Sequence, residues 1–226
     1  MTKAIIFDSS TLINFSINGL LPELRGLKEL FDGKFLITEE IMDEVIDKPM
    51  KIKRYELEAL KLKELLSDKI LETPSSLNID ENRIPKMTNE ILNVANSTFF
   101  VHGNAMHIID VGEASCLALS RLLNEKGIKN IISVDERTMR LLCEKPENLF
   151  AIFQKKLHTN VEFRRENIKS FQDFRFIRST ELIYIAYKKG IVKLRDHGDV
   201  LDAVLYAMKL NGCSISEDEI SEMKKL

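Results

Sequence analysis

Two short, largely apolar runs that each end in an aspartate constrain the fold of this chain most strongly. Residues 4–7 precede Asp8, and residues 131–134 precede Asp135. Such runs are typical of strands buried on both faces, as in parallel sheets. Residues 34–37 form a third run of the same kind. Because functional groups gather at the carboxyl ends of parallel strands, we expect Asp8 and Asp135 to lie at one edge of a sheet.

Segments with helical periodicity separate these runs. Thr38 is a suitable N-cap for a helix that follows residues 34–37. A short strand is expected at residues 70–73, a loop at 74–85, and little regular pattern is evident in 145–176. The predicted helices cover residues 11–15, 22–31, 39–47, 55–66, 90–95, 110–123, 138–142, 181–188 and 200–208. This alternation predicts an α/β fold of three layers, with a central parallel sheet flanked by helices.

The composition is that of a globular protein without a strong overall field. Net charge is -2, with 30% charged and 44% hydrophobic residues, which argues against a protein that simply coats nucleic acid. The three cysteines are far apart and form no CxxC pair, so a zinc site built on thiolates is not expected. No apolar stretch is long enough to span a membrane. We therefore expect a cytoplasmic protein without a membrane partner.

Five acidic residues are candidates for one metal site. Two carboxylates on neighbouring strands, Asp8 and Asp135, would repel each other, and a divalent cation removes this repulsion. Glu44 lies beside the apolar face of the helix expected at residues 39–47, while Asp110 and Glu113 share one face of a later helix. An all-carboxylate site suits Mg²⁺ or Mn²⁺ and the hydrolysis of a phosphodiester.

Each of these acids also has a purely structural interpretation. Asp8 is a candidate N-cap for the helix after it, and Asp110 with Glu113 forms a candidate capping box. Glu44 lies among other acids that are expected to be solvated. A phosphatase of the haloacid dehalogenase kind is disfavoured, because Ser10 stands where its second aspartate is needed.

Basic residues interleave with phenylalanines in the stretch 153–178. Such a mixture suits the phosphates and unstacked bases of single-stranded RNA. Arg164, Arg165 and Arg178 are the candidate RNA-binding residues from this stretch. The alternative is a solvated helix face over a phenylalanine core.

Four segments of the chain resemble, in order, the acidic motifs of PIN-domain nucleases. They are residues 5–13, 38–45, 111–118 and 133–137, and the third contains Gly112-Glu113-Ala114 as in one branch of that family. Residues 176–192 and 211–216 also look like the family's C-terminal part. The resemblance implies a Rossmann-like sheet, Mg²⁺ or Mn²⁺ as cofactor, and endoribonuclease activity. By position it implies Asp8, Glu44, Glu113 and Asp135 as the core site, with Asp110 as an accessory ligand.

The expected organisation is a single PIN-like domain over residues 1–226, with helical elaborations near 50–105 and 145–175. These elaborations, and Arg178 to Glu181 where relatives often have a glycine-containing turn, are departures from the family pattern. The expected function is metal-dependent cleavage of single-stranded RNA. The alternative is a catalytically inactive PIN-fold module that binds RNA or protein. An antitoxin protein and a second copy of the chain are candidate partners implied by the resemblance.

Overall fold

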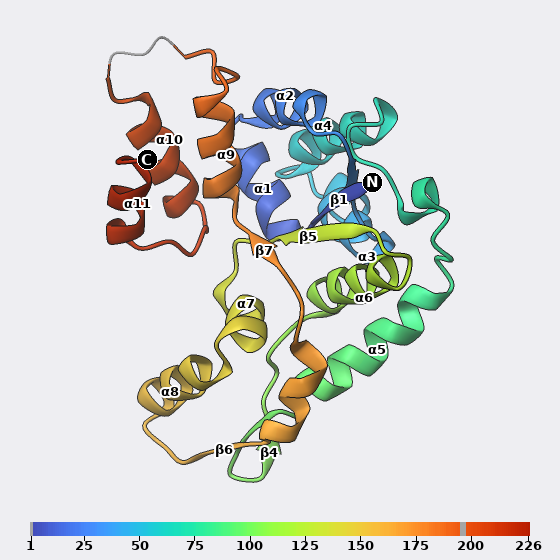
Figure 1. Ribbon diagram of the computed structural model, residues 1–226, viewed down its shortest axis with the longest axis vertical. Coiled ribbons are helices and arrows are strands. Elements are labelled where there is room, and N and C mark those ends of the chain that lie inside the picture. The colour runs from blue at the N-terminus through green and yellow to red at the C-terminus, as the bar shows by residue number, and fades with distance from the viewer. Residues whose placement is uncertain (1, 195–197) are drawn as a thin grey trace.

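A four-stranded parallel sheet lies at the centre of the computed structural model, which describes residues 2–194 and 198–226 (Figure 1). The strands are arranged in the order β2-β1-β5-β7. Their bounds are β1 (Lys3–Phe7), β2 (Lys34–Leu36), β5 (Lys129–Ser133) and β7 (Phe176–Ile177). In register, Ile5 lies opposite Phe35 on one side and Ile131 on the other. Because β1 is central in the sheet, its last four residues are buried. This burial explains why these residues are apolar, the pattern from which the strand was predicted.

Helices cover both faces of this sheet and make three layers (Figure 1). On one face α1, α2 and α9 pack against one another, and on the other α6 packs against β1 and β5 and is covered by α5. The α-helices are α1 (Ser9–Ile17), α2 (Leu21–Leu30), α3 (Glu39–Met42), α4 (Glu56–Ser67), α5 (Arg83–Ala95), α6 (Val111–Glu125), α7 (Arg137–Glu144), α8 (Pro146–Leu157), α9 (Ser179–Lys188), α10 (Val200–Leu210) and α11 (Glu217–Met223). The predicted three-layer α/β architecture with a parallel sheet is therefore confirmed. No helix of the described residues is both long enough and apolar enough to cross a membrane.

A second, antiparallel sheet lies beyond α7 at the lower end of Figure 1. Its order is β4-β3-β6, with β3 (Phe99–Val101), β4 (Asn104–Ala105) and β6 (Val161–Phe163). The rings of Phe99 and Phe163 stack with centroids 4.7 Å apart, which ties β3 to β6. The two segments expected to be helical elaborations, near 50–105 and 145–175, thus also contribute strands.

The sequence-based boundaries are correct for the strong patterns and wrong for the weak ones. Thr38 caps α3, since its hydroxyl accepts from the amide of Ile41 at 3.3 Å, and the helix continues as a π-helical turn, η1 (Asp43–Asp47). The strand expected at 70–73 is only an isolated bridge between Leu36 and Glu72. Helix α5 begins at Arg83 rather than at residue 90, because Pro85 lies in its first turn, where a proline is tolerated. Three further turns are 3-10 helical: η2 (Pro49–Lys51), η3 (Pro74–Leu77) and η4 (Arg165–Phe171).

Candidate active site: a cluster of carboxylates at the sheet edge

Asp8 lies at the carboxyl end of β1 and is the N-cap of α1. Its carboxylate accepts from the amide of Ser10 at 3.1 Å and from the hydroxyl of the same residue at 2.5 Å. The side chain is 3% exposed, and burial raises its pKa to about 6 despite these hydrogen bonds, with the nearby charge of Glu44 adding to the rise. The capping role predicted for Asp8 is confirmed, and the residue also carries a charge that its surroundings disfavour.

Glu113 faces Asp8 from the first turn of α6. One of its carboxylate oxygens, Oε2, accepts from the backbone amide of Asp110 at 3.0 Å. The other, Oε1, is buried and has no hydrogen-bond partner among the described residues. Burial raises the pKa of Glu113 to about 9, and the charges of Asp8, Glu136 and Asp110 add to the effect. An unpartnered buried carboxylate oxygen that feels further negative charges is unfavourable without a cation.

Glu44 reaches the same place from η1 and lies on the solvent side. Its Oε1 accepts from the hydroxyl of Ser9 at 2.9 Å. A Cβ on Gly112 would approach Oε2 of Glu44 to 3.0 Å and Cδ1 of Ile41 to 3.1 Å. The glycine of the third motif therefore lets the start of α6 approach Glu44 closely.

Asp135, at the end of β5, is 1% exposed and fully hydrogen-bonded. Its Oδ1 accepts from the amide of Ser179 at 2.7 Å, and its Oδ2 accepts from the hydroxyl of Ser179 at 2.6 Å and from the amide group of Asn14 at 2.7 Å. The backbone amide of Asp135 donates to the hydroxyl of Ser10 at 3.0 Å. Ser10 thereby joins Asp135 to Asp8, while the Asp135 carboxylate itself is held towards α1 and α9.

Two further acids lie at the rim. Asp110 is the N-cap residue of α6, and its exposed carboxylate lies 2.6 Å from Nε2 of His107. Glu136, the residue after Asp135, has a pKa raised first by burial and then by the charges of Asp110 and Glu44. The negative charge at this edge therefore extends beyond the residues singled out in the sequence.

Basic side chains do not neutralise the cluster. Among the described residues, no lysine or arginine forms an ion pair with Asp8, Glu44, Glu113 or Asp135. The thiol of Cys116, 3.8 Å from the carbonyl oxygen of Phe7, is also affected by the charges of these carboxylates. Its pKa is raised by burial and then by the charges of Asp8, Glu113, Glu40 and Glu44. Carboxylates from three stretches of the chain thus lie close enough at this edge to raise one another's pKa values.

The structure brings Asp8, Glu44 and Glu113 within reach of one another's charges and links Asp135 to them through Ser10. As the side chains stand, no three His, Cys, Asp or Glu residues of the described ranges are arranged to hold a metal ion. Asn14 and Ser179, which orient Asp135, were not found from the sequence. The one available signal was a polar residue, Asn14, between Ile13 and Phe15.

The candidate RNA-binding arginines are not paired with the carboxylate cluster. Arg164 covers the ring of Phe100 at 4.0 Å, and Arg165 makes two hydrogen bonds to Glu147 beside the second sheet. Arg178 is only 12% exposed in its side chain and pairs with Glu181 and Glu219. Its charge is therefore already compensated within the protein.

Comparison with known proteins adds no assignment. No family model, no curated protein and no solved structure matches the chain.

Proposed function

We propose that this chain is a PIN-like endoribonuclease that hydrolyses phosphodiester bonds of single-stranded RNA with the help of Mg²⁺ or Mn²⁺. The observation that supports this most is the buried pair of Asp8 and Glu113. Both have raised pKa values, Oε1 of Glu113 has no partner among the described residues, and no basic side chain there compensates them. A divalent cation fits this set of hard oxygen ligands.

The residues of the cluster fit such an ion in distinct ways. Asp8 and Glu113 would supply buried carboxylate oxygens, and Asp135 and Asp110 would be further ligands. A bound ion would polarise the phosphoryl group and offset the charge that develops on it. Glu44, on the solvent side with a hydrogen bond from Ser9, would orient an attacking water. Asn14 and Ser179 fix the direction of the Asp135 carboxylate.

The remaining parts of the proposal follow from the likeness of the four acidic segments to PIN-domain nucleases. They are cleavage that leaves a 5′-phosphate and a 3′-hydroxyl, association with an antitoxin protein, and a homodimer. They concern the cleavage products and the partners, and the proposed metal site at the carboxylates does not depend on them.

The cleavage prediction is direct. The purified protein should degrade single-stranded RNA in Mg²⁺ or Mn²⁺, and Asp8→Asn or Asp135→Asn should each lower the rate by about 100-fold or more, because a metal ligand is lost. Gel analysis of a labelled oligoribonucleotide measures the rate. Asp218→Asn is the matched control, since Asp218 is exposed on α11. Wild-type rates in both site variants would refute the assignment.

A second function, an inactive module that binds RNA or protein, is favoured by one observation. The Asp135 carboxylate already accepts three hydrogen bonds. If these bonds persist, Asp135 supplies no oxygen to an ion. Calorimetric titration with Mn²⁺ separates the two functions, because the nuclease binds the ion and the inactive module shows no binding in the millimolar range while still retaining RNA.

A further inference from the structure

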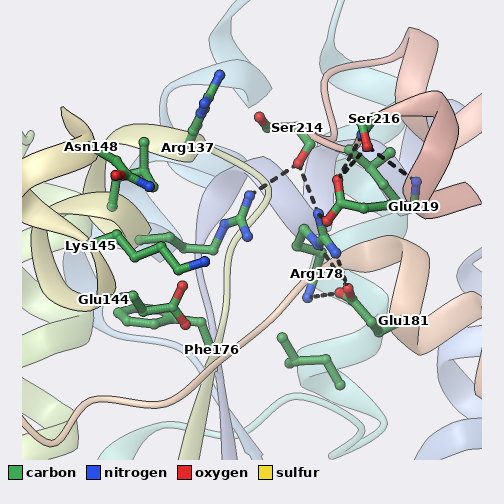
Figure 2. Close-up of a pocket in the computed structure, with 14 residues that line it drawn as sticks. Arg137, Glu144, Lys145, Asn148, Phe176, Arg178, Glu181, Ser214, Ser216 and Glu219 are labelled. Carbon is green, nitrogen blue, oxygen red and sulfur yellow. Dashed lines mark hydrogen bonds and ion pairs between the residues drawn. The ribbon is translucent and has the colours of Figure 1, made fainter. Parts of the chain in front are cut away.

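A cavity opens at the same edge of the central sheet, on the side of β7. It has a volume of about 640 Å³. Residues 137–148, from α7 and the start of α8, form one wall, and residues near Arg178, Ser214 and Glu219 form the opposite wall (Figure 2). This volume is within the usual range for small-molecule sites, so the cavity has room for a nucleotide.

The two walls differ in how their charges are compensated. On one side Arg178 pairs with Glu181 and Glu219 and also donates to the carbonyl oxygen of Ser214 at 3.1 Å. The opposite wall carries Arg137, Arg140 and Lys145, with Glu144 as its one carboxylate. An excess of positive charge therefore remains on the α7 side.

The basic side chains on the α7 side have few or no hydrogen-bonding partners among the described residues. Arg140 donates to two carbonyl oxygens, of Glu136 at 3.3 Å and of Ser214 at 3.0 Å, and to no carboxylate. Burial, together with the charge of Arg178, lowers the pKa of Arg140, as expected for a cation without an anion. For Arg137 and Lys145, the described part of the chain supplies neither an ion pair nor a side-chain hydrogen bond. Such a group of cations is suited to an external anion.

We propose that this cavity binds a nucleotide of the single-stranded RNA next to the carboxylate cluster, with Arg137, Arg140 and Lys145 on its phosphate. The proposal rests on the function proposed above and adds the place where the substrate is held. It also replaces Arg164, Arg165 and Arg178 as the principal contacts to RNA.

The cavity and the carboxylate cluster share backbone. Asp135 is followed directly by Glu136 and Arg137, and the amide of Ser214 in the cavity wall donates to the carbonyl oxygen of Asp135 at 3.0 Å. A strand with one phosphate in the cavity would therefore continue past Asp135 towards Asp8. Phe176, half-buried in the same lining, offers an aromatic surface for a base. An acidic peptide would match the cations but would leave this ring unused.

RNA binding without cleavage tests the proposal. Anisotropy of a labelled, unstructured oligouridylate is measured in EDTA, where an enzyme that needs a divalent ion is inactive. We expect the double variant Arg137→Ala/Lys145→Ala to bind about tenfold more weakly than wild type, because charged contacts are lost. The slope of log affinity against log salt should also fall, by about 0.7 for each phosphate contact removed. A change below twofold would overturn the proposal.

The matched control is Lys155→Ala/Lys156→Ala, which removes the same charge from exposed positions in the last turn of α8. Equal weakening in this control would show that only overall charge is sensed and would also overturn the proposal. The proposal would also be overturned if a polyglutamate peptide of the same charge displaced the labelled oligouridylate at the same concentration as unlabelled oligouridylate does. Because no step needs catalysis, tight binding in the cavity with no cleavage in Mn²⁺ would refute the nuclease function alone.

Discussion

The hydrogen bonds of individual carboxyl groups distinguish a helix cap from a candidate metal ligand. An aspartate at the end of a strand or the start of a helix is common and is often only a cap, as Asp8 is for α1. Glu113 differs, because capping uses one of its oxygens and leaves the other buried without a partner among the described residues. A residue that served only as a cap would gain nothing from this arrangement. The geometry of Glu113 therefore argues for a ligand more strongly than that of Asp8.

Replacing Glu113 by glutamine should stabilise the metal-free protein. At about pH 8 the folded chain must take up a proton on Glu113, whereas the unfolded chain does not, and this lowers the free energy of unfolding. Glutamine removes that cost and keeps the acceptor for Asp110, so we expect a gain of about 2 kcal/mol, or about 4–8 °C in melting temperature. Thermal denaturation in EDTA measures it, and a lower melting temperature for Glu113→Gln would contradict the assignment.

At the residue scale, the sequence was informative where chemistry depends on position along the chain. The end of a strand located Asp8 and Asp135, and a spacing of three located Asp110 and Glu113. It was uninformative where contacts join distant segments. Asn14 reaches Asp135 across 121 positions, and Ser179 reaches it across 44. No periodic pattern encodes such pairs.

Among the elements, the short strand β7 and its neighbours depend on Arg178. This side chain joins the end of β7 to α9 through Glu181 and to α11 through Glu219. The sequence placed Arg178 among RNA-binding residues because basic and aromatic residues alternate there. The pattern could not show that two glutamates, three and 41 positions away, compensate its charge.

Arg178→Met should therefore act on stability rather than on RNA affinity. We expect the free energy of unfolding to fall by about 1–3 kcal/mol, because hydrogen bonds to two carboxylates and one carbonyl oxygen are lost from a nearly buried side chain. Urea denaturation measures this fall. In anisotropy at low temperature Arg178→Met/Glu219→Gln, which keeps the net charge of the cavity wall, should bind oligouridylate within twofold of wild type. A tenfold weaker affinity with unchanged stability would instead restore Arg178 as an RNA contact.

The elements with strong patterns were predicted, and those without were not. Strands β1 and β5 are central and buried, so their apolar runs identify them. Strand β7 has two residues, and the strands of the second sheet have two or three. Segments so short show no alternation, and only pairing with a neighbour defines them as strands.

At the scale of the whole molecule, buried apolar residues of both sheets belong to one continuous core, which includes Ile6, Phe99 and Leu117. The negative edge formed by Asp8 and Glu113 and the positive cavity wall with Arg140 lie side by side at the carboxyl ends of the central strands. The overall charge of -2 conceals this separation. Local arrangement rather than net charge therefore determines what this edge can bind.

The stability of the whole chain should depend on pH in a way that a divalent ion removes. The folded-state pKa of Glu113, about 9, and of Asp8, about 6, lie above the ordinary values of 4.5 and 3.8. A carboxyl group with a raised folded-state pKa contributes fully to stability when the pH is below its ordinary pKa. This contribution is lost as the pH rises through the folded-state pKa. Without metal, the melting temperature should fall from about pH 5 to about pH 9, and millimolar Mg²⁺ should flatten the decline. An identical profile with and without Mg²⁺ would contradict this.

Anomalous diffraction from a crystal grown with Mn²⁺ shows whether the carboxylate cluster holds a divalent ion. We expect a peak bound by carboxylate oxygens of Asp8 and Glu113, with Oε1 of Glu113 as one ligand and the Asp135 carboxylate close by. Its absence in a Glu113→Gln crystal grown in the same way would be the control. A crystal with Mn²⁺ bound elsewhere, or with the cluster neutralised by lysine or arginine side chains, would contradict the account.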